Sequence, residues 1–293
     1  MKLSLVIPVR DINDPKLKEL LRSIESQDFD KSQMETLIIT EGTSESAKAI
    51  GIRKAKGEVI GILASDNELP DIYTLKVLVP MAKEHGACYS RHYHLRKSDN
   101  ILNRYFSLIG GNDPLCFYMG KNDRVPIFQK ERIIPYGRSI GDNGFFVRRE
   151  LILNTDLDNY YHIDNSNEIK GYIEATFFHE TWHKTGGNIF SFFAKRYRYG
   201  LQHAFNKNRR WHLVDFRQPR DIWRLAWFIL CSVTVMEPLF LSIRGYLKVK
   251  DKAWFMHPIV ALGTVFTYGL LVLHLLVRML FQLLSAPTVA QKA

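Results

Sequence analysis

Residues 3–10 read Leu3-Ser4-Leu5-Val6-Ile7-Pro8-Val9-Arg10, an apolar run that is followed by an arginine. A continuous apolar run ended by proline is typical of a strand buried on both faces of a parallel sheet. Asp14 and Pro15 then supply the N-cap and the first residue of a helix. The leucines that follow recur at helical spacing, so one face of this helix would pack on the sheet. The stretch therefore predicts the first βα unit of an α/β domain.

The same alternation continues for about a hundred residues. Further strands are predicted at 36–39, 59–63 and 87–93, and further helices at 47–56 and 71–84, with Gly57 as the C-terminal glycine of the first. Strands that alternate with helices indicate a mostly parallel sheet with right-handed crossovers. Ligands of such sheets bind at the carboxyl ends of the strands. The polar residues that follow the first three strands, Arg10, Glu41 and Asp66, would therefore meet at one edge.

The second half of this region is less regular. Gly141-Asp142-Asn143-Gly144 precedes a short apolar run and a predicted helix from Arg148. A strand is expected at 175–179 and a helix with interleaved aromatic and basic residues at 189–201. The polar segments at 112–115 and 121–124 are interpreted as structural loops, with a lid or acceptor loop as the alternative.

Two long apolar segments, 222–247 and 259–284, follow. Each is close to the roughly 20 residues that cross a bilayer as a helix. Glu237-Pro238 interrupts the first and His274 lies in the second, and both a carboxylate and a proline are costly inside a membrane span. Two arrangements are open: a transmembrane helical hairpin, or a first segment that is re-entrant or interfacial. The alternative is a pair of buried helices in a soluble protein.

Charge supports a membrane location. The chain of 293 residues has a formal charge of +10. Much of the excess clusters before the first apolar segment, a position that favours the cytoplasmic side and anionic headgroups. The cluster comprises Lys195, Arg196, Arg198, Lys207, Arg209, Arg210, Arg217, Arg220 and Arg224. No recognition motif for nucleic acid accompanies it, so we expect no nucleic-acid partner. No signal peptide is expected, and the three cysteines lack metal-like spacing and are expected to be reduced.

Several motifs resemble family 2 glycosyltransferases. The nucleotide-sugar half is matched by residues 3–10, Glu41-Gly42-Thr43-Ser44, 55–59 and Ala64-Ser65-Asp66-Asn67, and the acceptor half by 141–149, Ile163-Asp164 and Glu168-Ile169. The resemblance implies a GT-A fold, Rossmann-like with a mostly parallel sheet, and inverting transfer from a nucleotide-diphosphate sugar to a lipid-linked or membrane-proximal acceptor. We expect a GT-A domain at 1–205, a basic juxtamembrane segment at 206–221, two membrane helices within 222–284 and a tail at 285–293.

The resemblance also implies site residues. Pro8, Arg10 and Glu41 would line the nucleotide pocket, with Lys48 near the diphosphate. Asp66, possibly with Glu68, would hold Mg²⁺ or Mn²⁺, although Ala64 replaces the first aspartate of the family's Asp-x-Asp motif. Asp164 matches the general base, and the alternatives are Asp142, Asp158 and Glu168. The residues expected at the diphosphate or an acceptor phosphate are His183, Arg148, Arg149, Lys195 and Arg198.

Two other functions fit parts of the sequence. His179-Glu180-Thr181-Trp182-His183 spells H-E-x-x-H, the signature of zinc metalloproteases. That chemistry needs a helix, whereas the flanking residues here favour a strand. Ala64 suggests a third function, a non-catalytic nucleotide-sugar-binding partner subunit.

Overall fold

A computed structural model describes residues 1–127, 144–170, 176–183, 188–204 and 209–284. Its strands are β1 (Leu3–Pro8), β2 (Met34–Ile39), β3 (Val59–Ile62), β4 (Asn67–Glu68), β5 (Ala87–Tyr93), β6 (Phe145–Arg148) and β7 (Thr176–His183). The helices of the N-terminal half are α1 (Pro15–Glu25), η1 (Lys31–Gln33), α2 (Ser44–Lys54), α3 (Thr74–His85), α4 (Ile101–Ile109) and α5 (Pro114–Met119). The later helices are α6 (Arg149–Leu153), α7 (His162–Lys170), α8 (Ile189–Ala204), α9 (Pro219–Thr234), α10 (Met236–Lys248), η2 (Lys252–Met256) and α11 (His257–Leu284).

The strands form one sheet in the order β2-β1-β3-β6-β5-β7-β4 within the described residues. β1 pairs in parallel with both β2 and β3, as the βα pattern predicts. β6 is antiparallel to both of its neighbours and β4 is antiparallel to β7, whereas β5 and β7 pair in parallel. The sheet is therefore mixed, and the expectation of a mostly parallel sheet holds only for β1 to β3.

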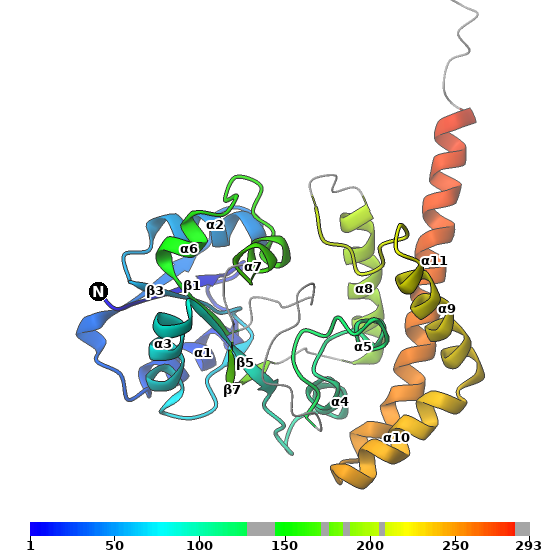
Figure 1. The fold of residues 1–293 in the computed structure, drawn as a ribbon, viewed down its shortest axis with the longest axis horizontal. Helices are drawn as coiled ribbons and strands as arrows, with labels where there is room; N and C mark the ends of the chain where they lie inside the picture. The colour runs from blue at the N-terminus through cyan, green and yellow to red at the C-terminus, as the bar shows by residue number, and fades with distance from the viewer. Residues whose placement is uncertain (128–143, 171–175, 184–187, 205–208, 285–293) are drawn as a thin grey trace, which may run out of the picture.

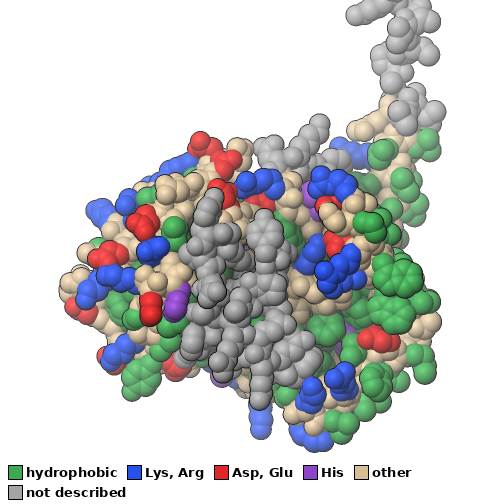
Figure 2. Space-filling view, viewed as in Figure 1, with side chains coloured by type: hydrophobic (Ala, Val, Ile, Leu, Met, Phe, Trp, Pro, Cys, Tyr) green, Lys and Arg blue, Asp and Glu red, His purple; other side chains and the backbone are tan. Residues whose placement is uncertain are grey.

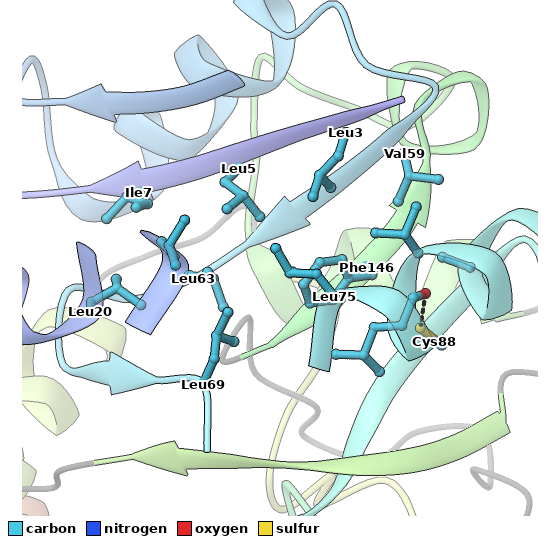
Figure 3. Close-up of a cluster of buried hydrophobic side chains, with 14 of the residues drawn as sticks. Leu3, Leu5, Ile7, Leu20, Val59, Leu63, Leu69, Leu75, Cys88 and Phe146 are labelled. Carbon is cyan, nitrogen blue, oxygen red and sulfur yellow. Dashed lines mark hydrogen bonds between the residues drawn. The ribbon is translucent and has the colours of Figure 1, made fainter. Parts of the chain in front are cut away.

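Apolar residues of β1 and β3 are buried between helices that cover both faces of the sheet (Figure 1). Figure 3 shows one of these cores, where Leu3, Leu5 and Ile7 of β1 face the helix residues Leu20 and Leu75. All five are nearly fully buried. Burial of a leucine or isoleucine side chain stabilises the fold by about 1.5–3 kcal/mol. The sheet and its covering helices are thus a rigid frame for the strand ends.

The helix after β2 differs from the prediction at both ends. α2 begins at Ser44, because Thr43 and Ser46 form a capping box. It ends at Lys54, and Ala55 is already extended. Gly57 is therefore not a helix cap: a Cβ at Gly57 would lie 2.5 Å from the Ser4 amide nitrogen, so glycine lets the chain pass close to β1.

The first apolar segment forms two helices instead of one. α9 and α10 meet at an angle of 85°. The break is at Val235, whose φ of 62° is in the left-handed region, immediately before Glu237-Pro238. The Tyr118 hydroxyl donates a hydrogen bond to Glu237, which gives this carboxylate a partner. Such a bent pair is the geometry of a broken span or of a re-entrant loop, so the transmembrane hairpin and the re-entrant or interfacial alternative both stay predictions.

The second apolar segment lies within a single long helix, α11. The stretch Lys252–Gln282 is long and apolar enough to cross a membrane, and only 28% of its most apolar window is buried. The N-terminal part of α11 packs against α8, and the Gly200 Cα lies against Leu271. Phe192 of α8 shares a core with Trp254 of η2 and Val260 of α11. Helix α8 thus packs with the C-terminal helices, on the side of the molecule away from β1 (Figure 1).

Candidate functional site

The carboxyl ends of β1, β2 and β3 lie side by side and bring three predicted polar positions to one edge. Pro8 is level with Ile39, and the Val9 amide donates to the Ile39 carbonyl at 2.8 Å. The Leu63 amide donates to the Val6 carbonyl at 3.1 Å. The next turns carry Arg10 and Glu41, both exposed, and Asp66, which is half-buried. An arginine and carboxylates at such an edge are groups that bind phosphates and hard cations.

The turn that carries Asp66 is held by Asn67. The Asn67 side-chain oxygen accepts from the Ala64 amide at 2.9 Å, and the Asn67 amide donates to the Ala64 carbonyl at 2.9 Å. Asn67 is opposite His183 in the β4–β7 ladder, so the backbone of His183 lies beside this turn. Glu68 accepts a hydrogen bond from Arg96 at 3.2 Å. A cation therefore already neighbours Glu68, which favours Asp66 as the ligand of a metal ion.

Helix α7 is tied to the same edge through Glu45 at the start of α2. Glu45 accepts from the His162 ring at 2.8 Å and from the His162 amide at 3.1 Å, and Lys48 donates to it at 3.1 Å. Burial alone would raise the pKa of Glu45, but the charges of His162 and Lys48 lower it below its usual value. Lys48 is buried and bonded to Glu45, so its ammonium group does not face the open edge. Sequence reasoning missed Glu45 and His162.

Asp164, the predicted base, lies in the first turn of α7 and is 7% exposed. Its two carboxylate oxygens accept from the backbone amides of Arg210 at 2.9 Å and Trp211 at 2.7 Å. Arg210 also donates to Glu168 at 2.9 Å, and the Arg209 guanidinium stacks on Tyr161. Segment 209–211, which leads to α9, is therefore anchored on α7 by Asp164 and Glu168, two of the predicted bases.

Of the two remaining alternative bases, only Asp158 lies within the described residues. Asp158 forms an ion pair with Arg53 at 2.5 Å, and its side chain is 91% exposed. Asp142 is outside the described residues.

Arg148 and Arg149 lie at the amino end of β3, away from the turn that carries Asp66, and their assignment to an acceptor phosphate stays a prediction. β6 runs antiparallel to β3, and Arg148 is paired with Val59 at the amino end of β3. The three steps from Val59 to Ile62 span roughly 10 Å at 3.3 Å per residue, before the turn to Asp66 is counted. Arg149 donates to the Ala55 carbonyl at 2.8 Å and closes the loop before β3.

The two basic residues predicted on the later helix lie in the helical layer. Lys195 and Arg198 belong to α8, which packs on α11. Lys195 lies 5.6 Å from the centre of the Tyr199 ring. The sheet edge does not contain this helix.

The H-E-x-x-H motif lies in β7, an eight-residue strand paired in parallel with β5. A zincin places its two histidines on one face of a helix. The backbone at 179–183 is extended, so the arrangement that the metalloprotease alternative requires is not present.

The polar segment 121–124 is a structural loop with a buried network. Arg124 is fully buried, and its guanidinium donates to Ser90 at 2.9 Å and to the Asp123 carboxylate at 3.1 Å. The Tyr93 hydroxyl donates to the same carboxylate. The network joins the carboxyl end of β5 to the loop after α5. It agrees with the interpretation of residues 121–124 as a structural loop.

No group of three or more potential metal-ligating side chains occurs in the part of the chain that the structure describes. Asp66 therefore belongs to no such group among these residues. A hard cation can be held by one carboxylate when phosphate oxygens and water complete its coordination, so the donor set suits a metal shared with a bound diphosphate.

The chain matches no protein-family model and no curated protein. Solved structures show a distant likeness. The S. aureus TarS 1-349 complex with UDP-GlcNAc has 16% identity and a TM-score of 0.43, covering 87% of this chain and 90% of that one. Mannosyltransferase PcManGT from Pyrobaculum calidifontis, in complex with GDP-Man and Mn2+, has 12% identity and a TM-score of 0.47, covering 90% and 86%. A197 from STIV has 12% identity and a TM-score of 0.40, covering 64% and 87%. No residue role is taken from these likenesses.

Proposed function

We propose that this protein is an inverting GT-A glycosyltransferase that moves a sugar from a nucleotide-diphosphate donor to a lipid-linked or membrane-proximal acceptor. The observation that carries the proposal is that the turns carrying Arg10, Glu41 and Asp66 follow the carboxyl ends of three adjacent parallel strands. The motif resemblance of residues 3–67 to family 2 enzymes points to the same edge.

Each residue would have a distinct part in donor binding. Pro8 and Glu41 would border the nucleoside, and Arg10 would neutralise negative charge on the donor. Asp66, with Asn67 holding its turn, would bind Mg²⁺ or Mn²⁺ together with the diphosphate oxygens. The metal ion would offset the charge that develops on the leaving diphosphate. His183, beside Asn67 in the β4–β7 ladder, would complete this side of the site.

In the reaction, an acceptor oxygen attacks the anomeric carbon from the face opposite the diphosphate. The new carbon–oxygen bond forms as the bond from the anomeric carbon to the diphosphate breaks. The electron pair of the broken bond leaves with the nucleoside diphosphate. A hydroxyl acceptor must also lose a proton to a base, whereas a phosphate acceptor is already anionic. Asp164 is engaged by two backbone amides. We therefore favour a lipid phosphate as the acceptor, with Asp164 as the base only for a hydroxyl acceptor.

A bilayer would cover the exposed apolar faces of α9, α10 and α11. Figure 2 shows apolar side chains gathered along the side of the molecule that these helices form. Trp223 is 72% exposed, Phe240 62% and Phe266 65%. Large exposed apolar surfaces mark membrane or protein contacts, and the bend between α9 and α10 suits helices that lie in the interface. The basic segment before α9 would place the catalytic domain on the cytoplasmic side.

The test is a donor screen with the full chain in detergent. Thermal unfolding is followed with nucleotide diphosphates and their sugars, with and without Mn²⁺, and donor cleavage is then measured with a polyprenyl phosphate acceptor. We expect a metal-dependent rise of the melting temperature for one nucleotide and loss of that rise in Asp66→Ala. Glu58→Gln is the matched control, because Glu58 precedes β3 at the opposite end and pairs with Lys83 on the surface.

Three outcomes separate the alternatives. An equal response of Asp66→Ala and wild type to every nucleotide would refute the metal-site assignment. Binding of a nucleotide without transfer to any acceptor would favour the partner-subunit alternative. Stoichiometric zinc that is lost on His183→Ala would revive the metalloprotease.

A further inference from the structure

A cavity of about 290 Å³ opens between α10, η2 and the C-terminal ends of α4 and α5. Its apolar walls include Phe117, Leu241 and Trp254. Trp254 lies directly on the backbone of α10, because a Cβ on Gly245 would come within 2.4 Å of its ring. His257 closes one side, but it is buried and hydrogen-bonded to Tyr105 at 2.7 Å. The cavity is therefore a largely apolar slot whose histidine is already hydrogen-bonded.

Two cations line the same cavity. Arg244 and Lys248 are one turn apart on α10, and both are exposed. Residues four apart on a helix lie next to each other, so both charges are on one face. Arg244 forms no ion pair with a carboxylate of the described residues. An apolar slot that carries two positive charges suits a ligand with an apolar chain and an anionic end.

The proposed membrane association would bring the cavity to the depth of lipid headgroups. On α10 the residues next to the two cations are Ile243 and Leu247, which are 47% and 64% exposed. If α10 lies in the interface with this apolar face in the bilayer, the Arg244–Lys248 pair is at the level of the phosphates. This step rests on the membrane association in the proposed function.

A chain of hydrogen bonds links the wall of the cavity to the carboxyl end of β5. The wall residue Ile109 accepts, through its carbonyl, from the Asn122 side chain at 2.9 Å. The next residue, Asp123, accepts from Tyr93 at the carboxyl end of β5. A ligand in the cavity would thus lie against α4, which is bonded to the loop at the end of β5.

We propose that this cavity binds the phosphate end of a single-chain lipid phosphomonoester, with the phosphate between Arg244 and Lys248 and the first carbons of the chain against Trp254 and Leu241. A phosphomonoester carries about −1.5 to −2 charges at neutral pH, which two cations match. The volume is at the lower limit of ordinary ligand cavities, so it suits one chain rather than two. The ligand would be the lipid acceptor of the proposed transferase.

The experiment compares farnesyl phosphate, farnesol and inorganic phosphate as ligands of the full chain in neutral detergent, by isothermal titration calorimetry. Farnesyl phosphate should bind, and the other two should bind at least about tenfold more weakly. Farnesol lacks the phosphate that the two cations would bind, and inorganic phosphate lacks the apolar chain. The double variant R244A/K248A should lose about tenfold or more in affinity. The control K250A/K252A removes the same charge from two exposed lysines outside the cavity and should stay within about twofold.

A second variant tests the apolar half. Leu241→Trp fills the slot and leaves both cations in place, so farnesyl phosphate should fall toward the affinity of inorganic phosphate. The melting temperature without ligand shows whether each variant is folded. Equal binding of farnesol and farnesyl phosphate, or equal losses in the two double variants, would overturn the proposal. Comparable binding of dioleoyl phosphatidic acid would also overturn it, in favour of general contact with bilayer lipid.

Nucleotide binding separates this proposal from the proposed function. If R244A/K248A keeps the metal-dependent nucleotide response of wild type but loses farnesyl phosphate, both stand. Farnesyl phosphate binding without any nucleotide response would leave the lipid site in place and remove the transferase. A nucleotide response without farnesyl phosphate binding would do the reverse.

Discussion

Asp164 is where the structure makes the sharpest quantitative prediction. Its buried carboxylate accepts two backbone hydrogen bonds from Arg210 and Trp211, at 2.9 and 2.7 Å. A hydrogen bond to a charged group contributes about 1.5–3 kcal/mol. The two donors are only partly buried, so water compensates for some of the loss. Asp164→Ala should therefore weaken the attachment of segment 209–211 to α7 by about 2–4 kcal/mol.

Limited trypsin digestion measures how often this segment detaches, because Arg209 and Arg210 are cleavage sites within the anchored segment. When opening is fast relative to cleavage, the rate follows the population of the open form, so about 2–4 kcal/mol corresponds to roughly 30- to several-hundred-fold faster cleavage. Mass spectrometry of the fragments identifies the cut. Asp158→Asn is the control, because that side chain is 91% exposed and should change the rate little.

The same variants separate an anchor from a base. Asp164→Asn retains one acceptor oxygen, so it should fall between wild type and Asp164→Ala in the digestion. Cleavage of Asp164→Ala at the wild-type rate would refute the anchoring role. Wild-type cleavage together with lost transfer to a hydroxyl acceptor would assign Asp164 to catalysis instead.

Two further predictions concern stability. The pKa of Glu45 is lowered in the folded state, so its ion-pair contribution is complete above pH 4.5 and is lost as the pH falls below that value. The urea midpoints at pH 7 and pH 3.5 should therefore differ more for wild type than for Glu45→Gln. Glu25→Gln, which changes an exposed carboxylate, is the control, and an equal difference for wild type and Glu45→Gln would contradict the prediction. Gly245→Ala should destabilise the packing of α10 on Trp254 by about 1–3 kcal/mol. Gly269→Ala, with no atom within 4 Å of the added methyl, should be neutral or stabilising by up to about 1 kcal/mol. Equal melting temperatures for the two variants would refute the close-contact explanation.

Local patterns were sufficient for the first half of the fold. The apolar run at 3–8 and the polar positions after each strand predict β1 to β3 and the edge where Arg10 and Asp66 lie. These features depend on neighbours within a few residues, such as the Asp14 cap and Pro15 of α1. Such interactions are visible in a single sequence.

Long-range pairings were not visible in this way. The bond between Glu45 and His162 joins residues 117 positions apart, and no periodicity indicates it. The Glu45–Lys48 spacing, one turn of helix, was the only local signal for this cluster. The antiparallel direction of β6, which places Arg148 beside Val59 at the amino end of β3, was likewise not visible in the sequence.

Composition and periodicity were thus enough to identify an α/β chain with an apolar C-terminal part, because the spacing of apolar residues within each segment indicates which of its faces is buried. The direction of β6, the bend at Val235, the engagement of Asp164 by segment 209–211 and the cavity beside Arg244 depended on how distant segments pack. Those features arise from contacts between residues far apart in the chain, and close packing selects among them by fractions of an ångström that no local pattern encodes.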